Sequence, residues 1–538
     1  MFDGNELWKE RLGLNMEERV YCGKTYTTYR DLPDNLYLGM KEMARRYPEK
    51  VCITDDDGTK VTFREFLKLT DEFADFMMLE EKVSPGDHVA LMMFNCREFC
   101  VAFVALIKIG VMVLPLPSKF KQKEVLSLME KSDCSMVICD RKFAEWLLPL
   151  EKKGTKVLVS DGSVQTYGFG KLLASFGTPE EHVACHARPE DPAVLMFTSG
   201  TTSMSKGAVL TNFNVMHAIF TYQKLLDITP EDKSIIAVPI YHVTGLIAIL
   251  GLFLCSGGEV YLHRIFDADR VLRCVRDNRL TFIHGAPTVF SMLLQKKESF
   301  PKLPSLRAFA CGSSNMPKEK IRALHEWLPQ MVFHTVYGLT ETSSPATVFP
   351  DDAAVSDKIG SSGIPIPGTV FRIVDESGKE KGAGETGEVQ LKGSVVIREY
   401  YKLSTKALDE EGWLATGDLG YFTEDGYIYL VDRIKDIINR GGEKICSYDV
   451  ENELYLMEGI EEAAVVGIPD SLYGETAAAM VKCAPGYALE EKEIQEYLKE
   501  RMAKYKVPTK IMFVEQIPLT PNGKVNKRKI REMLKEKE

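Results

Sequence analysis

The chain has 538 residues, of which 45% are hydrophobic and 27% are charged, as in ordinary globular proteins. A single hydrophobic core rarely grows past roughly 300 residues, so this length predicts more than one domain. The net charge of -10 argues against a general nucleic-acid-binding protein, because no basic cluster is dense enough to offset it.

Short apolar runs alternate with segments of helical periodicity along the first part of the chain. Segments 63–78 and 123–131 have the spacing of amphipathic helices. The strand-like runs are 51–54, 88–93, 136–139 and 156–159, and the same texture continues at 234–239, 260–262 and 280–284. Strands separated by helices predict βαβ units, and therefore an α/β fold with largely parallel sheets.

Two long apolar runs, 101–117 and 245–255, could belong to a core or to a membrane. The first is interrupted by Lys108 and Gly110, and the second is shorter than the about 20 residues of a spanning helix. We therefore expect both to be buried core elements, and we expect no integral membrane segment.

The 12 cysteines and the first residues of the chain bear on the compartment. The cysteines form no C-x-x-C pair, and Cys96 and Cys100 lack the histidine pattern of a zinc site. Residues 1–6 are acidic and lack the apolar core of a signal peptide. Free thiols in a reducing cytoplasm are the simplest interpretation.

A loop rich in hydroxyl groups follows the apolar, strand-like run 193–197. Its N–H groups and Lys206 suit an anion, for which phosphate is the obvious candidate. Gly200 and Lys206 are spaced as in the P-loop, but Ser205 and Gly207 replace its second glycine and its Mg²⁺-binding hydroxyl. A solvated surface connection is the alternative. The residues expected to bind phosphate are Thr198, Ser199, Gly200, Thr201, Thr202 and Lys206.

Segment 337–342 places a glycine, hydroxyls and a carboxylate next to one another. In a tight loop, Glu341 can hold Mg²⁺ and Thr340 can contact a phosphate oxygen. A helix N-cap at Thr340 is the common alternative for such a pair. Together with a phosphate loop, the metal-binding interpretation is favoured.

The texture of the chain changes twice after this segment. Between about 360 and 429, short strands and Gly-rich turns predict a small β-barrel-like subdomain of antiparallel strands. Helix–strand alternation then returns, with helices near 450–457 and 491–502 and strands near 463–468 and 478–483. We predict an N-terminal domain over 1–434 and a small α+β C-terminal domain over 435–538.

Three turns in this last part carry groups suited to a ligand. Asp418 can accept hydrogen bonds from both hydroxyls of a ribose, although aspartate is also common in ordinary turns. Gly441 and Gly442 allow a ligand close to the backbone. Lys524 follows a Pro/Asn/Gly turn and begins a short basic run, 524–529, that we expect to be a solvated face.

Taken together, these segments resemble the adenylate-forming (ANL) superfamily of acyl-CoA synthetases, adenylation domains and luciferases. The loop resembles the family core TSGTTGxPKG, with Ser203 in place of its glycine and Ser205 in place of its proline. Residues 337–341 match YGxTE at every fixed position, and 416–418 match TGD. Six motifs follow one another in the family order and spacing, up to Lys524.

For ATP, the resemblance implies contacts from several matched segments. Glu341 would bind the Mg²⁺ that accompanies ATP, and Tyr337 would flank the adenine. Asp418 and Arg433 would hold the ribose. The other implied nucleotide contacts are those of the phosphate loop and of Gly312, Ser313, Ser314, Gly338 and Thr340.

For catalysis, the resemblance implies two steps, with a rotation of a mobile C-terminal domain between them. Lys524 would neutralise charge between the substrate carboxylate and the α-phosphate in the first step. Lys435 would be the hinge, and Gly441 and Gly442 would then line the tunnel for the pantetheine arm of coenzyme A. The other expected catalytic residues are Thr340, Glu341, Lys206 and His242.

Segment 241–245 lies where the family builds its acyl pocket. It lacks the aspartate of amino-acid adenylation domains, and Val243 replaces the asparagine typical of hydroxybenzoate-adenylating enzymes. His242 followed by apolar residues resembles fatty-acyl-CoA ligases, while a packed core histidine fits the spacing as well. Segments 284–287 and 311–314 are the other expected pocket walls.

We therefore predict an ATP-dependent carboxylic acid:CoA ligase that forms acyl-AMP and then acyl-CoA, releasing pyrophosphate and AMP, from a fatty or similar apolar acid. An adenylation enzyme that loads a carrier-protein phosphopantetheine is the first alternative, and a non-catalytic nucleotide-binding regulator is the second. The expected partners are small molecules and no nucleic acid. The sequence leaves open the acyl chain length, aliphatic or aromatic preference, and whether the chain forms a homodimer.

Overall fold

Three sheets formed by residues 51–365 consist mainly of parallel strands, as the sequence predicted. The structure is a computed structural model that describes residues 1–160, 168–198, 206–520 and 524–535. The largest sheet has the order β11-β10-β7-β6-β8-β9. Its strands are β6 (His88–Met92), β7 (Met112–Pro115), β8 (Met136–Asp140), β9 (Lys156–Ser160), β10 (Pro192–Thr198) and β11 (Lys206–Thr211).

A hairpin fixes both ends of the predicted phosphate loop. The sequence predicted the strand before this loop but not the strand after it, β11, which pairs antiparallel with β10 and sets Thr198 opposite Lys206. The loop residues Ser199, Gly200, Thr201 and Thr202, together with Ser203 and Ser205, lie outside the described residues. The hairpin therefore places the two ends of the loop at the same edge of the sheet.

Two further sheets continue the parallel arrangement. One has the order β12-β13-β4-β5, and the other β14-β15-β16-β17-β18. The strands of the first are β4 (Val51–Thr54), β5 (Lys60–Thr62), β12 (Lys233–Ile236) and β13 (Glu259–Leu262). Those of the second are β14 (Phe282–Gly285), β15 (Ala308–Cys311), β16 (Val332–Tyr337), β17 (Thr347–Val348) and β18 (Ile364–Pro365).

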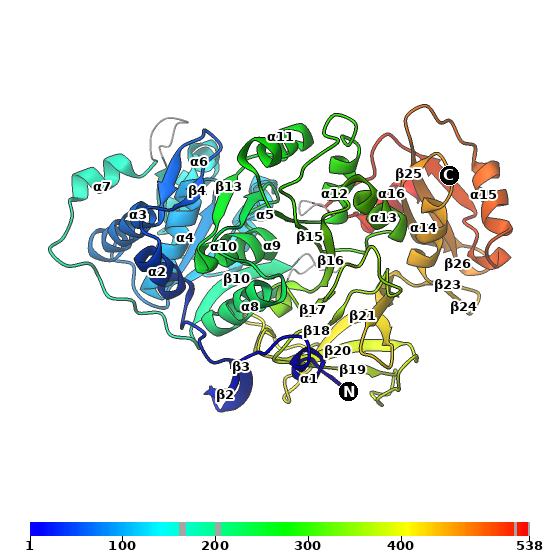
Figure 1. The fold of residues 1–538 in the computed structure, drawn as a ribbon, viewed down its shortest axis with the longest axis horizontal. Coiled ribbons are helices and arrows are strands. Elements are labelled where there is room, and N and C mark those ends of the chain that lie inside the picture. The colour runs from blue at the N-terminus through cyan, green and yellow to red at the C-terminus, as the bar shows by residue number, and fades with distance from the viewer. Residues whose placement is uncertain (161–167, 199–205, 521–523, 536–538) are drawn as a thin grey trace.

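Helices connect and cover these sheets (Figure 1). The apolar run 101–117 forms α4 (Arg97–Ile109) and β7, and the run 245–255 forms a π-helical turn (Leu246–Gly251) and α10 (Leu252–Ser256), all of them buried in two hydrophobic clusters. No helix among the described residues is long and apolar enough to cross a bilayer. The other helices of this part are α2 (Leu36–Arg46), α3 (Phe63–Asp75), α5 (Gln122–Lys131), α6 (Arg141–Leu147), α7 (Gly170–Phe176), α8 (Asn212–Leu225), α9 (Val243–Gly245), α11 (Ala268–Asn278), α12 (Pro287–Leu294) and α13 (Lys318–Trp327).

An antiparallel sheet follows, as the change of texture predicted, and it lies below the parallel sheets in Figure 1. Its strands are β19 (Thr369–Val374), β20 (Gly387–Gly393), β21 (Leu414–Phe422) and β22 (Ile428–Arg433), and β1 (Phe2–Asp3) pairs with β19. The sequence did not predict β1, α1 (Gly4–Lys9) or the hairpin of β2 (Met16–Tyr21) and β3 (Lys24–Tyr29). These N-terminal segments are short and take their place from contacts with distant residues, such as the bond from the Trp8 indole to the Pro365 carbonyl at 2.9 Å.

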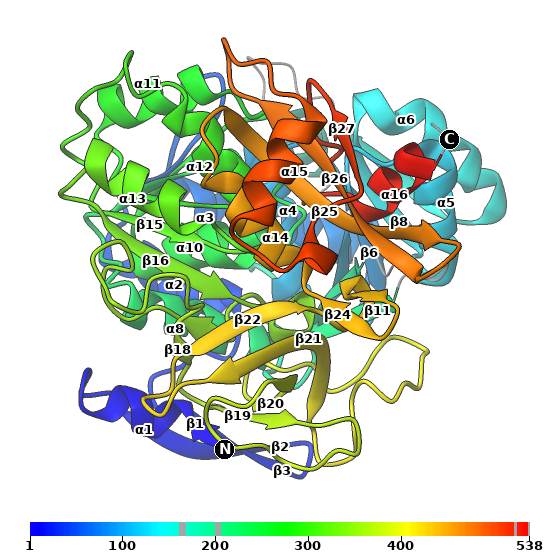
Figure 2. The ribbon, with the colours of Figure 1, turned by 90° about the vertical axis from the view of Figure 1, so that its right-hand side faces the viewer.

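The last part of the chain has its own sheet and hydrophobic clusters. The strands are β23 (Ile438–Arg440), β24 (Glu443–Ile445), β25 (Ile460–Asp470), β26 (Gly474–Cys483) and β27 (Lys510–Phe513), and the helices are α14 (Ser447–Tyr455), α15 (Glu491–Lys499) and α16 (Lys527–Lys535). Two clusters separate from the main core fill the two faces of this sheet. Figure 2 shows this segment in front of the other sheets.

Candidate active site

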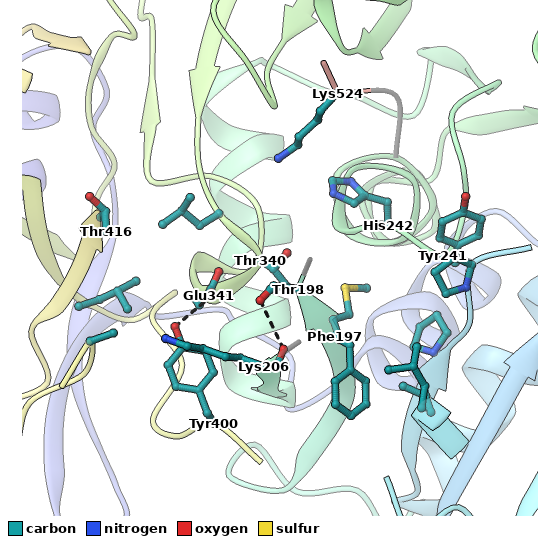
Figure 3. A pocket seen from close by; sticks show the side chains of 18 of the residues that line it. Phe197, Thr198, Lys206, Tyr241, His242, Thr340, Glu341, Tyr400, Thr416 and Lys524 are labelled. Atoms are coloured by element: carbon teal, nitrogen blue, oxygen red, sulfur yellow. Dashed lines mark hydrogen bonds between the residues drawn. The ribbon is translucent and has the colours of Figure 1, made fainter. Parts of the chain in front are cut away.

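Lys524 extends from the C-terminal segment and lines three adjoining cavities of the structure. A short hairpin carries it, in which the Thr520 N–H donates to the Lys524 carbonyl at 2.7 Å and Leu519 pairs with Val525. Burial and the nearby Arg433 lower the pKa of Lys524 to about 8, although Asp418 and Glu341 oppose this shift. In Figure 3 its side chain enters from the side opposite Lys206 and Tyr400.

The first cavity, of about 270 Å³, is bounded by a cation and a carboxylate from distant segments. Lys206 lies at the start of β11, with Nζ 5.2 Å from the centre of the Tyr400 ring. The Tyr400 hydroxyl donates to Glu341 Oε1 at 3.0 Å. Burial and Glu341 raise the pKa of Tyr400, so the hydroxyl keeps its proton. No sequence motif pointed to Tyr400, because its contacts depend on tertiary packing.

Thr340 and Glu341 line this cavity from a 3₁₀ turn (Thr340–Thr342) that follows β16. Gly338 is required before the turn, because a Cβ there would lie 1.5 Å from the Ser344 carbonyl oxygen. Among the described residues, no group of three or more His, Cys, Asp or Glu side chains could hold a metal. Mg²⁺ commonly takes one carboxylate and completes its shell with phosphate and water, so Glu341 fits Mg²⁺ bound together with a nucleotide.

The second cavity, of about 60 Å³, is built around Asp418. The pairing of β21 with β22 sets Asp418 opposite Arg433, whose Nε lies 3.2 Å from Asp418 Oδ1. The Tyr337 hydroxyl donates to Asp418 Oδ2 at 2.7 Å. A carboxylate has about four acceptor positions, so these bonds leave capacity for further hydroxyl donors. Ser313, Ser314 and Gly338 also line this cavity.

The third cavity contains His242 and has a volume of only about 30 Å³. His242 Nδ1 accepts a hydrogen bond from the Thr244 N–H at 3.4 Å. Burial lowers the pKa of His242 to about 3, with further contributions from Lys524 and His284, so its imidazole is neutral. His242 lines this cavity and the first one, beside Lys524.

Tyr222 and His284 also line the third cavity. Tyr222, on α8, is fully buried, and its hydroxyl lies 2.9 Å from Ser344 Oγ. The rings of Tyr222 and His284 meet edge to face, with centres 5.4 Å apart. Burial lowers the pKa of His284 to about 3. Gly312 and Ser313, from the predicted wall 311–314, lie in the same lining, whereas Tyr222 was not predicted.

The remaining predicted residues lie in two places. Lys435 lines the first cavity from the 3₁₀ turn Ile434–Asp436. Gly441 and Gly442 form the exposed turn between β23 and β24, with φ values of 60° and 96°, and line none of the three cavities. The expectation that 524–529 is a solvated face holds for Arg528 and Lys529, which are exposed, and is wrong for two other lysines: Lys524 enters the cavities, and Lys527 Nζ lies 3.1 Å from Glu451 Oε1.

The chain matches two family models. The model of the AMP-binding enzyme matches residues 40–401, and the model of the AMP-binding enzyme C-terminal domain matches residues 449–524. Among curated proteins, feruloyl-CoA synthase from Amycolatopsis sp is 31% identical, with 91% of this chain and 96% of that protein covered. Medium-chain fatty-acid–CoA ligase from Escherichia coli (strain K12) is 30% identical, with 90% and 88% covered.

Solved structures resemble the whole fold. ATP-bound MatB from Rhodopseudomonas palustris superposes with a TM-score of 0.85 at 28% identity, covering 93% of this chain and 98% of that chain. O-succinylbenzoate coenzyme A synthetase (MenE) from Bacillus subtilis, in complex with ATP and a magnesium ion, gives a TM-score of 0.81 at 27% identity, with 94% and 99% covered.

Proposed function

Because the chain belongs to the family of AMP-binding enzymes and is an AMP-forming acid–thiol ligase, we propose that it joins a compact apolar carboxylic acid to coenzyme A through an acyl-adenylate. The observation that carries the proposal is the position of Lys524. One ammonium group lies where the cavities of Lys206 and Glu341, of Asp418, and of His242 meet.

The chemistry has two balanced steps. An oxygen of the substrate carboxylate attacks the α-phosphorus of ATP, the bond to the β-phosphate oxygen breaks, and pyrophosphate leaves with the electron pair. The sulfur of coenzyme A then attacks the acyl carbon, AMP leaves with the electron pair, and the thiol proton is released. Positioning and charge neutralisation account for the first step, as in other phosphoryl chemistry.

The residues predicted to contact ATP or Mg²⁺ have the following roles in this proposal. Lys206 and the loop that it follows hold the leaving phosphates, and Lys524 neutralises charge between the carboxylate and the α-phosphate. Asp418 and Arg433 hold the ribose, and Tyr337 with the segment 312–314 borders the adenine. Thr340 contacts a phosphate oxygen, and Glu341 would hold Mg²⁺, which when bound neutralises phosphate charge and polarises the reacting phosphoryl group.

The division into domains over 1–434 and 435–538 belongs to the same proposal. The separate hydrophobic clusters of the C-terminal segment support it. Rotation about Lys435 would withdraw Lys524 and bring the exposed Gly441–Gly442 turn to the acyl-adenylate for thioester formation. The observed arrangement, with Lys524 inside the cavities, suits the adenylate-forming step.

The third cavity supports the finer proposal about the acid. An acid whose carboxylate meets Lys524 extends past His242 toward Tyr222 and His284. At about 30 Å³ this cavity is the smallest of the three that Lys524 lines, so a long chain requires these side chains to move. Of the fatty or similar apolar acids that the sequence predicted, the compact ones fit best.

A panel of acids tests this proposal. With coenzyme A as acceptor, we expect pyrophosphate release to be fastest with short straight-chain acids or compact aryl acids and slowest with long-chain acids. His284→Ala removes part of the lining of the third cavity and should shift the preference toward longer acids. Tyr222→Phe removes only a hydroxyl from the same lining and serves as the matched control. Higher activity with long-chain acids than with short ones in the unaltered enzyme would contradict the proposed compact acid.

The acceptor is tested in the same assay. We expect free coenzyme A to be acylated in preference to a holo-carrier protein. The reverse preference would establish the carrier-loading alternative, and no pyrophosphate release with any acid would favour a non-catalytic regulator.

The pH dependence reports on Lys524. Its ammonium must be charged to neutralise the developing negative charge, and its pKa is lowered to about 8. The charged form is therefore present below about pH 8 and is lost above it. Between about pH 7 and about pH 9 we expect kcat/KM for ATP in adenylate formation to fall about tenfold, since this parameter reports the free enzyme. A profile that stays level across this range would exclude the titration of Lys524.

A further inference from the structure

Lys320 connects the N-terminal part of the structure to the C-terminal segment. It lies on α13, and its Nζ is 4.7 Å from the centre of the Tyr455 ring on α14. The same ammonium donates to Ser291 Oγ on α12 at 3.0 Å. Ser291 Oγ in turn donates to the Pro287 carbonyl at 2.9 Å, so its oxygen is oriented to accept from Lys320. The ammonium is thus held between α12 and α14.

The C-terminal segment offers negative charge at this contact. Burial lowers the pKa of Lys320, while Glu462 and Glu461 at the start of β25 favour its charged form. Glu461 also accepts a hydrogen bond from Gln295, beyond the end of α12, and pairs with Lys482 at 2.7 Å. A cation held over an aromatic face in a partly desolvated site is more strongly attracted than one at an exposed site.

The helix that Lys320 contacts also fixes the base of the Lys524 hairpin. Lys527, at the start of α16, donates to Ser447 Oγ at 2.5 Å and lies 3.1 Å from Glu451 Oε1. Both partners are on α14, Ser447 at the opposite end from Tyr455 and Glu451 one turn before Tyr455. Helix α14 thereby links the Lys320 contact to the start of α16, three residues after Lys524.

We propose that Lys320 is a positioning residue that holds α14 against α12 and α13, and so keeps Lys524 inside the cavities during adenylate formation. The inference rests on the proposed function. The contact joins the two parts of the chain in the observed arrangement, so any rotation that withdraws Lys524 must break it. Lys320 therefore stabilises the arrangement for the first step and contributes nothing to the second.

Half-reaction measurements test this role. With Lys320→Met we expect ATP–pyrophosphate exchange to fall about tenfold, as for the loss of a desolvated cation–π contact, while thioester formation from supplied acyl-AMP stays within about twofold. Tyr455→Leu should give the same pattern, and the double variant should fall no further than either single variant. Lys320→Arg keeps a cation over the ring and should restore most of the exchange rate.

Arg322→Ala is the matched control, because Arg322 lies on the same helix and pairs with Glu319 of that helix at the exposed surface. It should leave both half-reactions unchanged. An unchanged rate of ATP–pyrophosphate exchange in Lys320→Met would overturn the inference. So would an equal loss of both half-reactions in Lys320→Met and Tyr455→Leu.

Amide hydrogen exchange gives a readout that does not require turnover. Lys320→Met should speed exchange in α14 and in the 524–526 segment, relative to the unaltered protein and to Arg322→Ala. If the unaltered enzyme activates no acid, the proposed function is wrong. If the amides of α14 are as well protected in Lys320→Met as in the unaltered protein, the role of Lys320 is wrong, whatever the activity.

Discussion

Lys524→Ala is expected to lower the rate of ATP–pyrophosphate exchange by about 10² to 10³-fold, while thioester formation from supplied acyl-AMP persists. The ammonium lies at the junction of three cavities, among Glu341, Asp418 and Arg433. Charge develops on oxygen as the carboxylate attacks phosphorus, and a preorganised cation in a partly buried site stabilises it at no cost of reorganisation. In the proposed second step, Lys524 is withdrawn and is not needed.

The matched control for this variant is Lys529→Ala. Lys529 belongs to the same basic run but is exposed on α16, so its removal should leave both half-reactions unchanged. Equal retention of both half-reactions in Lys524→Ala would show that the lysine is not the catalytic cation. An equal loss of both would indicate a structural role.

Glu341→Gln is expected to reduce kcat/KM for ATP by about 10²-fold and to raise the Mg²⁺ concentration required for half-maximal rate. The amide keeps the size of the side chain and can still accept from the Tyr400 hydroxyl, which now lies 3.0 Å from Glu341 Oε1. What it removes is the negative charge, and a neutral oxygen binds a hard cation far less strongly. The effect should therefore appear in metal dependence rather than in folding.

The Mg²⁺ titration separates this variant from others with low activity. Excess Mg²⁺ should restore part of the rate in Glu341→Gln and none in Lys524→Ala. Glu399→Gln serves as the control, because Glu399 is exposed and adjacent to Tyr400. If the two glutamine variants have the same Mg²⁺ requirement, Glu341 is not the metal ligand.

Local patterns were sufficient for the class of fold. The alternation of apolar runs with helical segments predicted the parallel sheets, and the Gly-rich turns after residue 360 predicted the antiparallel sheet. Both predictions are confirmed, because the period of apolar side chains follows directly from which face of an element is buried. The N-terminal strands were missed, since short segments that pair with distant partners carry little periodic signal of their own.

The candidate site also contains some residues that sequence motifs predicted and others that they did not. The motifs named the residue types that a nucleotide requires, including Glu341 and Asp418, because backbone turns and charged groups at fixed spacing are local properties. No such motif contains Tyr400, Tyr222 or Lys320. Each of them contacts elements that are far away in the chain. Their positions depend on how sheets and helices pack against one another.

Lys524 shows the division most clearly. From the residues alone we predicted an α/β chain with a candidate phosphate-binding loop, a carboxylate suited to Mg²⁺ and a lysine on a turn. The family resemblance implied that this lysine enters the active site, while the basic run around it was expected to face solvent. The groups around the lysine, among them Glu341, Asp418 and His242, and the pairing of Lys527 with Glu451 are visible only in the folded chain. The charge and size of a side chain follow from the identity of the residue. Its burial and its partners depend on contacts between distant segments that folding brings together.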